Sequence, residues 1–219
     1  WFYNRENVYS WLGADESLFA EDFSELEYKG SWVTDESVLR ELENRYEQKS
    51  ADGGLDFTYA VTIQNHMSYT EEKYGDCACP EVETTAELSP EIQTAVNVYA
   101  EGIRDANAML AELTEFYSAQ EEPVLLLFFG DHLPYLGDNR QGYIELGLSA
   151  AEIYGGEDPY AAYTAPFLLW CNEAAAQELD FEAAIEALEL PGDGRISACY
   201  LGAAVLELCG RGEVSPWFG

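Results

Sequence analysis

A run of six apolar residues, Val124 to Phe129, places the strongest constraint on the fold of this chain. A continuous apolar run of this length predicts a strand buried on both faces, which is typical of parallel sheets. Phe167 to Trp170 is a second run of the same kind. Leu55 to Ile63, rich in β-branched and aromatic residues, predicts a third strand that ends in Gln64-Asn65-His66.

Helical patterns alternate with these strands. Apolar residues recur at helical spacing, Thr34 or Asp35 is placed to cap one helix, and Pro90 sits at a first helical turn. The predicted helices cover residues 4–12, 35–49, 90–113, 181–188 and 198–209. This alternation predicts an α/β fold, a three-layer sandwich with a mainly parallel sheet. No repeat or linker divides the chain, so residues 1–219 are predicted to belong to a single domain without an internal boundary.

Composition narrows the class of protein. With 47% hydrophobic and 14% aromatic residues the chain can build a packed core. Its formal net charge is −32, from 42 acidic and 10 basic residues, which argues against binding nucleic acid through phosphate neutralisation. The acidity serves either surface solvation or the holding of cations near an anionic cell envelope. No apolar run approaches the roughly 18 residues of a membrane span.

The five cysteines fit neither a disulfide framework nor a zinc pattern. Cys77 and Cys79 lie in a polar loop, where a strained local disulfide or two free thiols are both open. The other cysteines are Cys171, Cys199 and Cys209.

Gly130-Asp131-His132 follows the first apolar run and supplies the best candidate for chemistry. A carboxylate oxygen and an imidazole nitrogen together suit Zn, Mn or Fe. Gly130 permits a close turn that lets both side chains reach one ion. The alternative is an aspartate capping a turn beside an ordinary surface histidine.

Three further residues are candidates for holding a phosphate or sulfate ester. His66 ends the third predicted strand, at the edge where ligands bind in such sheets, and Asn65 beside it is a further donor. Arg5 can grip a phosphate with two hydrogen bonds, flanked by the ring of Tyr3. The alternatives are a hydrogen-bonded structural histidine and an arginine paired to a carboxylate such as Glu6. No nucleophile elbow, phosphate-binding glycine loop or HExxH motif is present.

Several sequence blocks, in order, resemble the C-terminal part of the extracellular catalytic domain of lipoteichoic acid synthase-like phosphoglycerol transferases, in the sulfatase and alkaline phosphatase superfamily. The blocks are Phe2-Tyr3-Asn4-Arg5, Thr34-Asp35-Glu36, Ala60 to His66, Phe128 to Pro134, Thr164 to Trp170 and Ile196 to Gly202. The resemblance implies an alkaline phosphatase-like sandwich, here truncated at its N-terminal side. It implies that Asp131 and His132 are metal ligands, for Mn²⁺ first and for Mg²⁺, Zn²⁺ or Ca²⁺ as alternatives.

The resemblance also assigns the substrate residues. His66 corresponds to the histidine that contacts the phosphate group, and Arg5 with Tyr3 to the pair that grips glycerol phosphate, although the family usually has tryptophan at the position of Tyr3. The family's threonine nucleophile and a glutamate ligand precede the Phe2-Tyr3-Asn4-Arg5 block. We therefore expect no catalytic residue among the 219, weak metal affinity with a site that is empty or only partly filled, and no turnover by this chain alone.

For the whole enzyme the resemblance implies a phosphoglycerol lipid donor, a glycopolymer acceptor and a place on the extracellular side of the membrane, anchored by upstream helices. A homodimer through an exposed sheet edge is a further expectation. Two other functions stay open. One is a sulfatase or phosphodiesterase that uses water as the acceptor, and the other is a non-catalytic acidic envelope-binding module.

Overall fold

The computed structural model describes residues 4–49, 55–148, 160–179, 183, 185–186 and 194–211 of the chain. The chain divides into two compact units. Unit 1 comprises Trp1–Leu113 and Pro134–Ala162, and unit 2 comprises Thr114–Leu133 and Tyr163–Gly219. The prediction of one domain over residues 1–219 is not tested by this division and stays a prediction.

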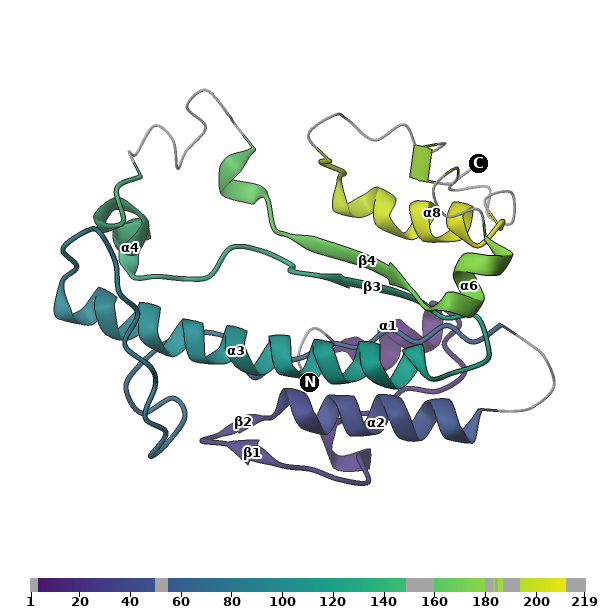
Figure 1. Ribbon diagram of the computed structural model, residues 1–219. Coiled ribbons are helices and arrows are strands. Elements are labelled where there is room, and N and C mark those ends of the chain that lie inside the picture. Colours follow the sequence, from purple (N-terminus) through teal and green to yellow (C-terminus); the bar gives the residue numbers. More distant parts are fainter. Residues whose placement is uncertain are drawn as a thin grey trace. The chain divides into compact units, whose positions relative to one another are not determined.

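Three predicted helices are confirmed in the first half of the chain. They are α1 (Arg5–Trp11), α2 (Asp35–Gln48) and α3 (Pro90–Ser118). The Thr34 hydroxyl caps α2 by accepting a hydrogen bond from the Ser37 amide, as a threonine at this position does in many helices. In unit 1, α2 and α3 lie side by side (Figure 1), and an ion pair between Arg40 and Glu112 joins them at 3.3 Å.

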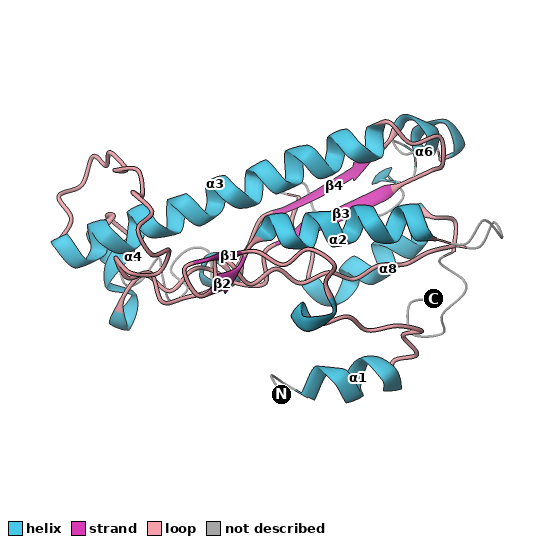
Figure 2. Cartoon of the chain, turned by 90° about the horizontal axis from the view of Figure 1, so that it is seen from below, coloured by secondary structure: helices cyan, strands magenta, loops and turns pink. Residues whose placement is uncertain are grey.

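A short hairpin precedes α2. Strands β1 (Tyr28–Lys29) and β2 (Trp32–Val33) pair antiparallel through a turn that contains Gly30. Gly30 has a φ of 62°, a left-handed conformation that glycine adopts without steric cost. Figure 2 shows this hairpin in magenta, and helices and loops make up the other parts of unit 1 that the structure describes.

The third predicted strand, Leu55 to Ile63, is wrong. These residues form no strand, and the alternating apolar side chains are exposed, from 85% for Phe57 to 37% for Ile63. The alternation is that of a half-buried strand, but a strand also requires a neighbour that accepts and donates backbone hydrogen bonds. Within the described part of the chain, no segment pairs with it.

The core of unit 1 includes a cluster in which two loop tyrosines pack against α3. Tyr69 and Tyr74 contact Ala95 and Val98 of this helix, together with Leu136. The remaining short elements of the unit are α4 (Gln141–Glu145) and the 3₁₀ turns η2 (Ala20–Asp22) and η3 (Asp138–Arg140). A further 3₁₀ turn, η4 (Ala161–Tyr163), spans the boundary between the units.

Unit 2 contains the two strongly apolar strands, β3 (Leu125–Phe129) and β4 (Phe167–Cys171). Both were predicted as strands, but they pair antiparallel, with Leu125 opposite Cys171 and Phe129 opposite Phe167. The mainly parallel sheet of a three-layer sandwich is therefore not found among the described strands, where both sheets are two-stranded and antiparallel. A continuous apolar run indicates that a strand is buried, but it does not indicate whether the neighbouring strand runs parallel or antiparallel to it.

Two helices follow β4 in unit 2, α6 (Glu173–Glu178) and α8 (Ala198–Leu208). Helix α8 confirms the predicted helix at 198–209 and lies beside the β3–β4 pair (Figure 1), where apolar side chains from both line a small pocket. It ends as predicted at Gly210, which has a φ of 64°, while the Arg211 amide donates back to the Leu206 carbonyl. The helix predicted near 181–188 lies mostly outside the described residues.

All five cysteines are free thiols. Of the two arrangements considered for Cys77 and Cys79, the structure has the free thiols. Burial raises the pKa of both, so the two side chains are held in the protonated form.

Candidate functional site

Asp131 and His132 lie where β3 leaves its pairing with β4. The Gly130 amide donates the last hydrogen bond, to the Pro166 carbonyl at 3.1 Å, and the next two side chains then extend into solvent. Their side chains are 83% and 65% exposed. The strand end thus presents a carboxylate and an imidazole next to each other.

One hydrogen bond fixes the proton on the His132 ring. Its Nδ1 atom lies 2.9 Å from the Leu133 carbonyl oxygen, which can only accept, so Nδ1 carries the hydrogen. In the neutral ring Nε2 then holds a lone pair, and Nε2 lies 3.5 Å from Asp131 Oδ2. A histidine that donates Nδ1–H to a backbone carbonyl and offers Nε2 has the arrangement common to metal-binding histidines.

The Asp131–His132 pair therefore fits a divalent metal by its donor atoms. One hard oxygen and one imidazole nitrogen suit Mn²⁺, Fe²⁺ or Zn²⁺. A four-coordinate site requires two more ligands. The described residues contain no group of three or more His, Cys, Asp and Glu side chains that could hold a metal. The pair would supply two of the four donor atoms that such a site requires.

His66 belongs to unit 1 and is exposed at the end of a turn. Its Nδ1 atom lies 2.9 Å from the Met67 carbonyl oxygen, so here too Nδ1 carries the hydrogen and Nε2 is the free ring nitrogen. The ring packs against Trp32, with 5.7 Å between ring centroids and 31° between planes. The imidazole is therefore held in place while one nitrogen stays available to a ligand.

The two residues before His66 anchor its turn. Gln64 is 1% exposed, accepts from the Asp35 amide at 2.8 Å and donates to Asp105 at 2.6 Å. Asn65 donates to the Tyr99 carbonyl and accepts from the Tyr74 hydroxyl. One N–H of the Asn65 amide fastens the turn to α3, and the expectation that Asn65 donates to a phosphate stays a prediction.

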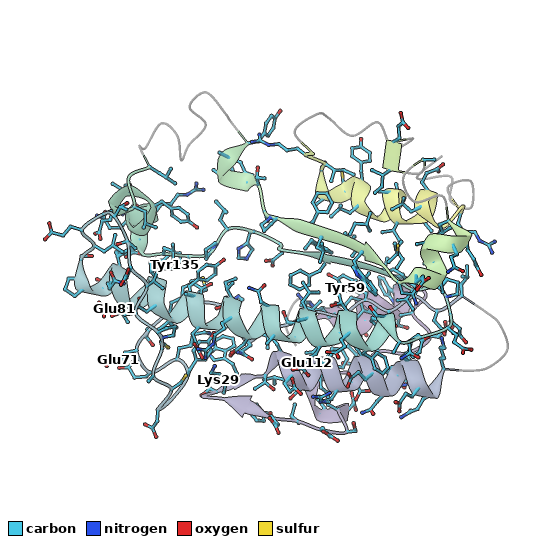
Figure 3. All side chains as sticks on the ribbon, in the orientation of Figure 1. Lys29, Tyr59, Glu71, Glu81, Glu112 and Tyr135 are labelled. Carbon is cyan, nitrogen blue, oxygen red and sulfur yellow. The ribbon has the colours of Figure 1, made fainter. Side chains whose placement is uncertain are left out.

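A partly buried ionic network contacts this turn through Asp105 and Gln64. Lys29 donates to Glu101 at 2.6 Å and to Asp105 at 2.5 Å, and Figure 3 shows Lys29 between the β1–β2 hairpin and α3. Burial opposes the charge of Lys29, but the hydrogen bonds and charges of Asp105 and Glu101 raise its pKa. Asp35, 2% exposed at the start of α2, has its pKa raised to about 6 by desolvation and then by the charge of Asp105.

Arg5 is the first residue of α1 and is partly buried in unit 1. Tyr3 lies outside the described residues. The structure thus places the predicted residues in two groups, with Asp131 and His132 adjacent in unit 2 and His66 and Arg5 in unit 1. The role proposed for each residue stays a prediction.

The residues that support His66 and its turn were not predicted from the sequence. Gly102 lies inside α3, where a Cβ atom would overlap the Asn65 side chain and lie 2.6 Å from the Tyr74 hydroxyl. A glycine within a strongly helical pattern is the signal that could have indicated this close packing. Lys29 and Lys73 carried a weaker signal, as two of only 10 basic residues in an acidic chain.

Comparison with known proteins supplies the family. A family model described as Sulfatase matches residues 1–210. The chain belongs to the sulfatase family. Members of this family share an alkaline phosphatase-like α/β fold and are generally enzymes that typically use a divalent metal. The superfamily expected from the sequence blocks is thereby confirmed, at the level of the family rather than of a particular reaction.

One relative of this sulfatase-family chain comes from Rhizobium meliloti (strain 1021) and is named "Putative cyclic beta-1,2-glucan modification protein". It is 26% identical over 182 residues, which cover 81% of this chain and 27% of the relative. The chain therefore spans about a quarter of the length of the relative that it matches. No solved structure matches the chain with significance. Across the described residues, no helix combines the length and the apolar character that crossing a membrane requires.

Proposed function

We propose that this chain is part of a metal-dependent phosphoglycerol transferase of the cell envelope, in which it supplies two metal ligands and the residues that hold the phosphate group. The observation that carries the proposal is the Asp131–His132 pair, with Nε2 of His132 left free and 3.5 Å from Asp131 Oδ2. Membership of the sulfatase family supports it, because enzymes of this family typically act on esters with a divalent metal.

The proposed roles follow from the donor atoms. Asp131 Oδ2 and His132 Nε2 bind the cation, with Mn²⁺ as the first choice. A divalent cation held there would neutralise charge that develops on a phosphoryl oxygen. Because Nδ1 of His66 donates to Met67, His66 can donate to a phosphate oxygen only through a second proton on Nε2. Arg5, with its guanidinium fork, grips another phosphate oxygen.

The acceptor that we propose is a hydroxyl of a glucan. The relative from Rhizobium meliloti carries glucan modification in its name, and a phosphoglycerol group is a modification that a sulfatase-family enzyme can transfer by ester exchange. A lipid donor and a glycan acceptor place the reaction at the outer face of the cell membrane, and this localisation is part of the proposal.

The full-length protein with Mn²⁺, a fluorescent phosphatidylglycerol and a β-1,2-glucan tests the proposal. We expect release of diacylglycerol together with glycerol phosphate on the glucan. Asp131→Asn should lower both at least about a hundredfold, because a metal ligand is lost. The matched control is Glu121→Gln, which removes the same charge at an exposed residue of unit 2.

Two outcomes would overturn the proposal. Release of free glycerol phosphate with no modified glucan would identify a hydrolase. No release at all, with Asp131→Asn unchanged in its binding of glucan and cations, would identify a non-catalytic envelope-binding module.

A further inference from the structure

Lys73 is a buried lysine in a chain dominated by carboxylates. It is 5% exposed, and the described part of the chain provides it with no carboxylate within ion-pair distance. Its Nζ instead donates to the His66 carbonyl oxygen at 2.5 Å and lies 3.8 Å from the Trp32 ring centroid. The contacts of this buried ammonium are therefore directed to the candidate phosphate-binding histidine and to the ring beside it.

The surrounding residues hold Lys73 firmly. Tyr74 and Tyr69 place their rings 5.0 Å and 5.8 Å from Nζ. A Cβ on Gly30 would overlap the Lys73 carbonyl oxygen and lie 3.1 Å from its carbon, so the hairpin turn packs directly on the Lys73 backbone. The same hairpin carries Trp32, and the ring of His66 packs on Trp32.

We propose that Lys73 is a positioning residue for His66, because it binds the His66 carbonyl and holds Trp32, the ring that orients the imidazole. The role of His66 toward phosphate rests on the proposed function, whereas the positioning itself can be measured without any substrate. A lysine fits this position because its ammonium group can donate to the His66 carbonyl while it is attracted to the faces of the surrounding aromatic rings.

The charge state of Lys73 allows the positioning of His66 to be tested by a change of pH. Burial lowers its pKa to about 8, so the ammonium is lost as the pH rises through that value. The titratable residues in contact with Lys73 are Tyr69, Tyr74 and His66. The nearby cation is Lys29, whose Nζ lies 5.1 Å from the centroid of the Tyr74 ring. Burial raises the pKa of Tyr74 further, which keeps this hydroxyl neutral over the same range.

Nuclear magnetic resonance of the 219-residue chain with ¹⁵N-labelled histidine tests the proposal. The chain has two histidines, so His66→Gln assigns both sets of ring signals and His132 serves as the internal control. We expect Lys73→Met to shift the His66 ring signals, because Trp32 would no longer be held in one position and its ring current at His66 would change. Lys73→Arg should return the signals most of the way to their positions in the unmodified chain. In the unmodified chain the His66 signals should move in a step near pH 8 that Lys73→Met abolishes.

Unchanged His66 signals in Lys73→Met, or no step near pH 8 in the unmodified chain, would overturn the positioning role. The pH titration of the unmodified chain decides the matter if Lys73→Met does not fold. Binding of inorganic phosphate, followed on the same signals, should weaken on the order of tenfold in Lys73→Met. If phosphate moves no His66 signal while Lys73→Met does, the proposed function fails and the positioning stands.

Discussion

The side-chain amide of Asn65 packs against the Cα atom of Gly102 in α3, in space that any Cβ atom at residue 102 would fill. Asn65 holds this position through the Tyr99 carbonyl and the Tyr74 hydroxyl. The turn that carries His66 is thereby fastened to a long helix, and the exposed imidazole has a rigid base. A candidate binding residue on a loop is useful only when its support is fixed in this way.

Gly102→Ala should destabilise the chain, although alanine favours a helix over glycine by about 1 kcal/mol. The added methyl group would displace Asn65 and the Tyr74 hydroxyl, and overpacking of this kind costs roughly 1–3 kcal/mol. Urea unfolding measures the change. Gly202→Ala, at an exposed position of α8, is the control and should be neutral or stabilising. Equal stabilisation by both substitutions would show that Asn65 moves away freely.

Asp35→Asn should stabilise the chain at neutral pH. Because the pKa of Asp35 is raised from 3.8 to about 6, the folded state binds this proton more tightly than the unfolded chain does. The stability from Asp35 is therefore fully present below about pH 4 and is lost as the pH rises through about 6. We expect the variant to gain up to about 3 kcal/mol at pH 7 and almost nothing at pH 4.

Urea unfolding of the Asp35→Asn variant at several pH values checks this. Asp76→Asn is the matched control, because any lost carboxylate relieves some repulsion in a chain with a net charge of −32. A gain that is the same for both variants, or that does not vary with pH, would contradict the assignment to the buried carboxyl of Asp35.

Asn172→Ala should be strongly destabilising in unit 2. Its Nδ2 donates to the carbonyls of Tyr117, Gln120 and Glu122, and its Oδ1 accepts from the amides of Val124 and Ala175. Asn172 is 2% exposed, so its loss leaves buried backbone groups without partners, at a cost of about 3 kcal/mol or more. Urea unfolding measures it, with the exposed Asn107→Ala in α3 as a control that should change little.

Asp131→Asn and His132→Gln should each weaken Mn²⁺ binding to the 219-residue chain by about tenfold or more, because each removes one of two donors. The concentration of free Mn²⁺, measured by electron paramagnetic resonance in about 0.15 M salt, reports the affinity and suppresses nonspecific attraction to the acidic surface. A loss of the same size in Glu121→Gln would show that general electrostatic attraction, and not the pair, accounts for the binding.

Local sequence patterns were sufficient to predict α1, α2, α3, α8 and the two apolar strands, but not the short helices α4 and α6. Helices α2, α3 and α8 follow from apolar spacing and from Thr34, Pro90 and Gly210 at their ends, because capping and periodicity act within a few neighbouring residues. The Asp131–His132 pair was found for the same reason, since two adjacent residues after a buried strand stay together in any fold that keeps the strand.

The pairing of the strands and the support of His66 could not be predicted from local sequence patterns. The antiparallel pairing of β3 with β4 depends on segments far apart in the chain. The same is true of residues 55–63, with which no described segment pairs. The contacts of Gln64 with Asp105 and of Asn65 with Gly102 likewise join residues that are far apart in the chain. Backbone periodicity fixes which faces of an element are apolar, while long-range hydrogen bonding and packing decide what covers them.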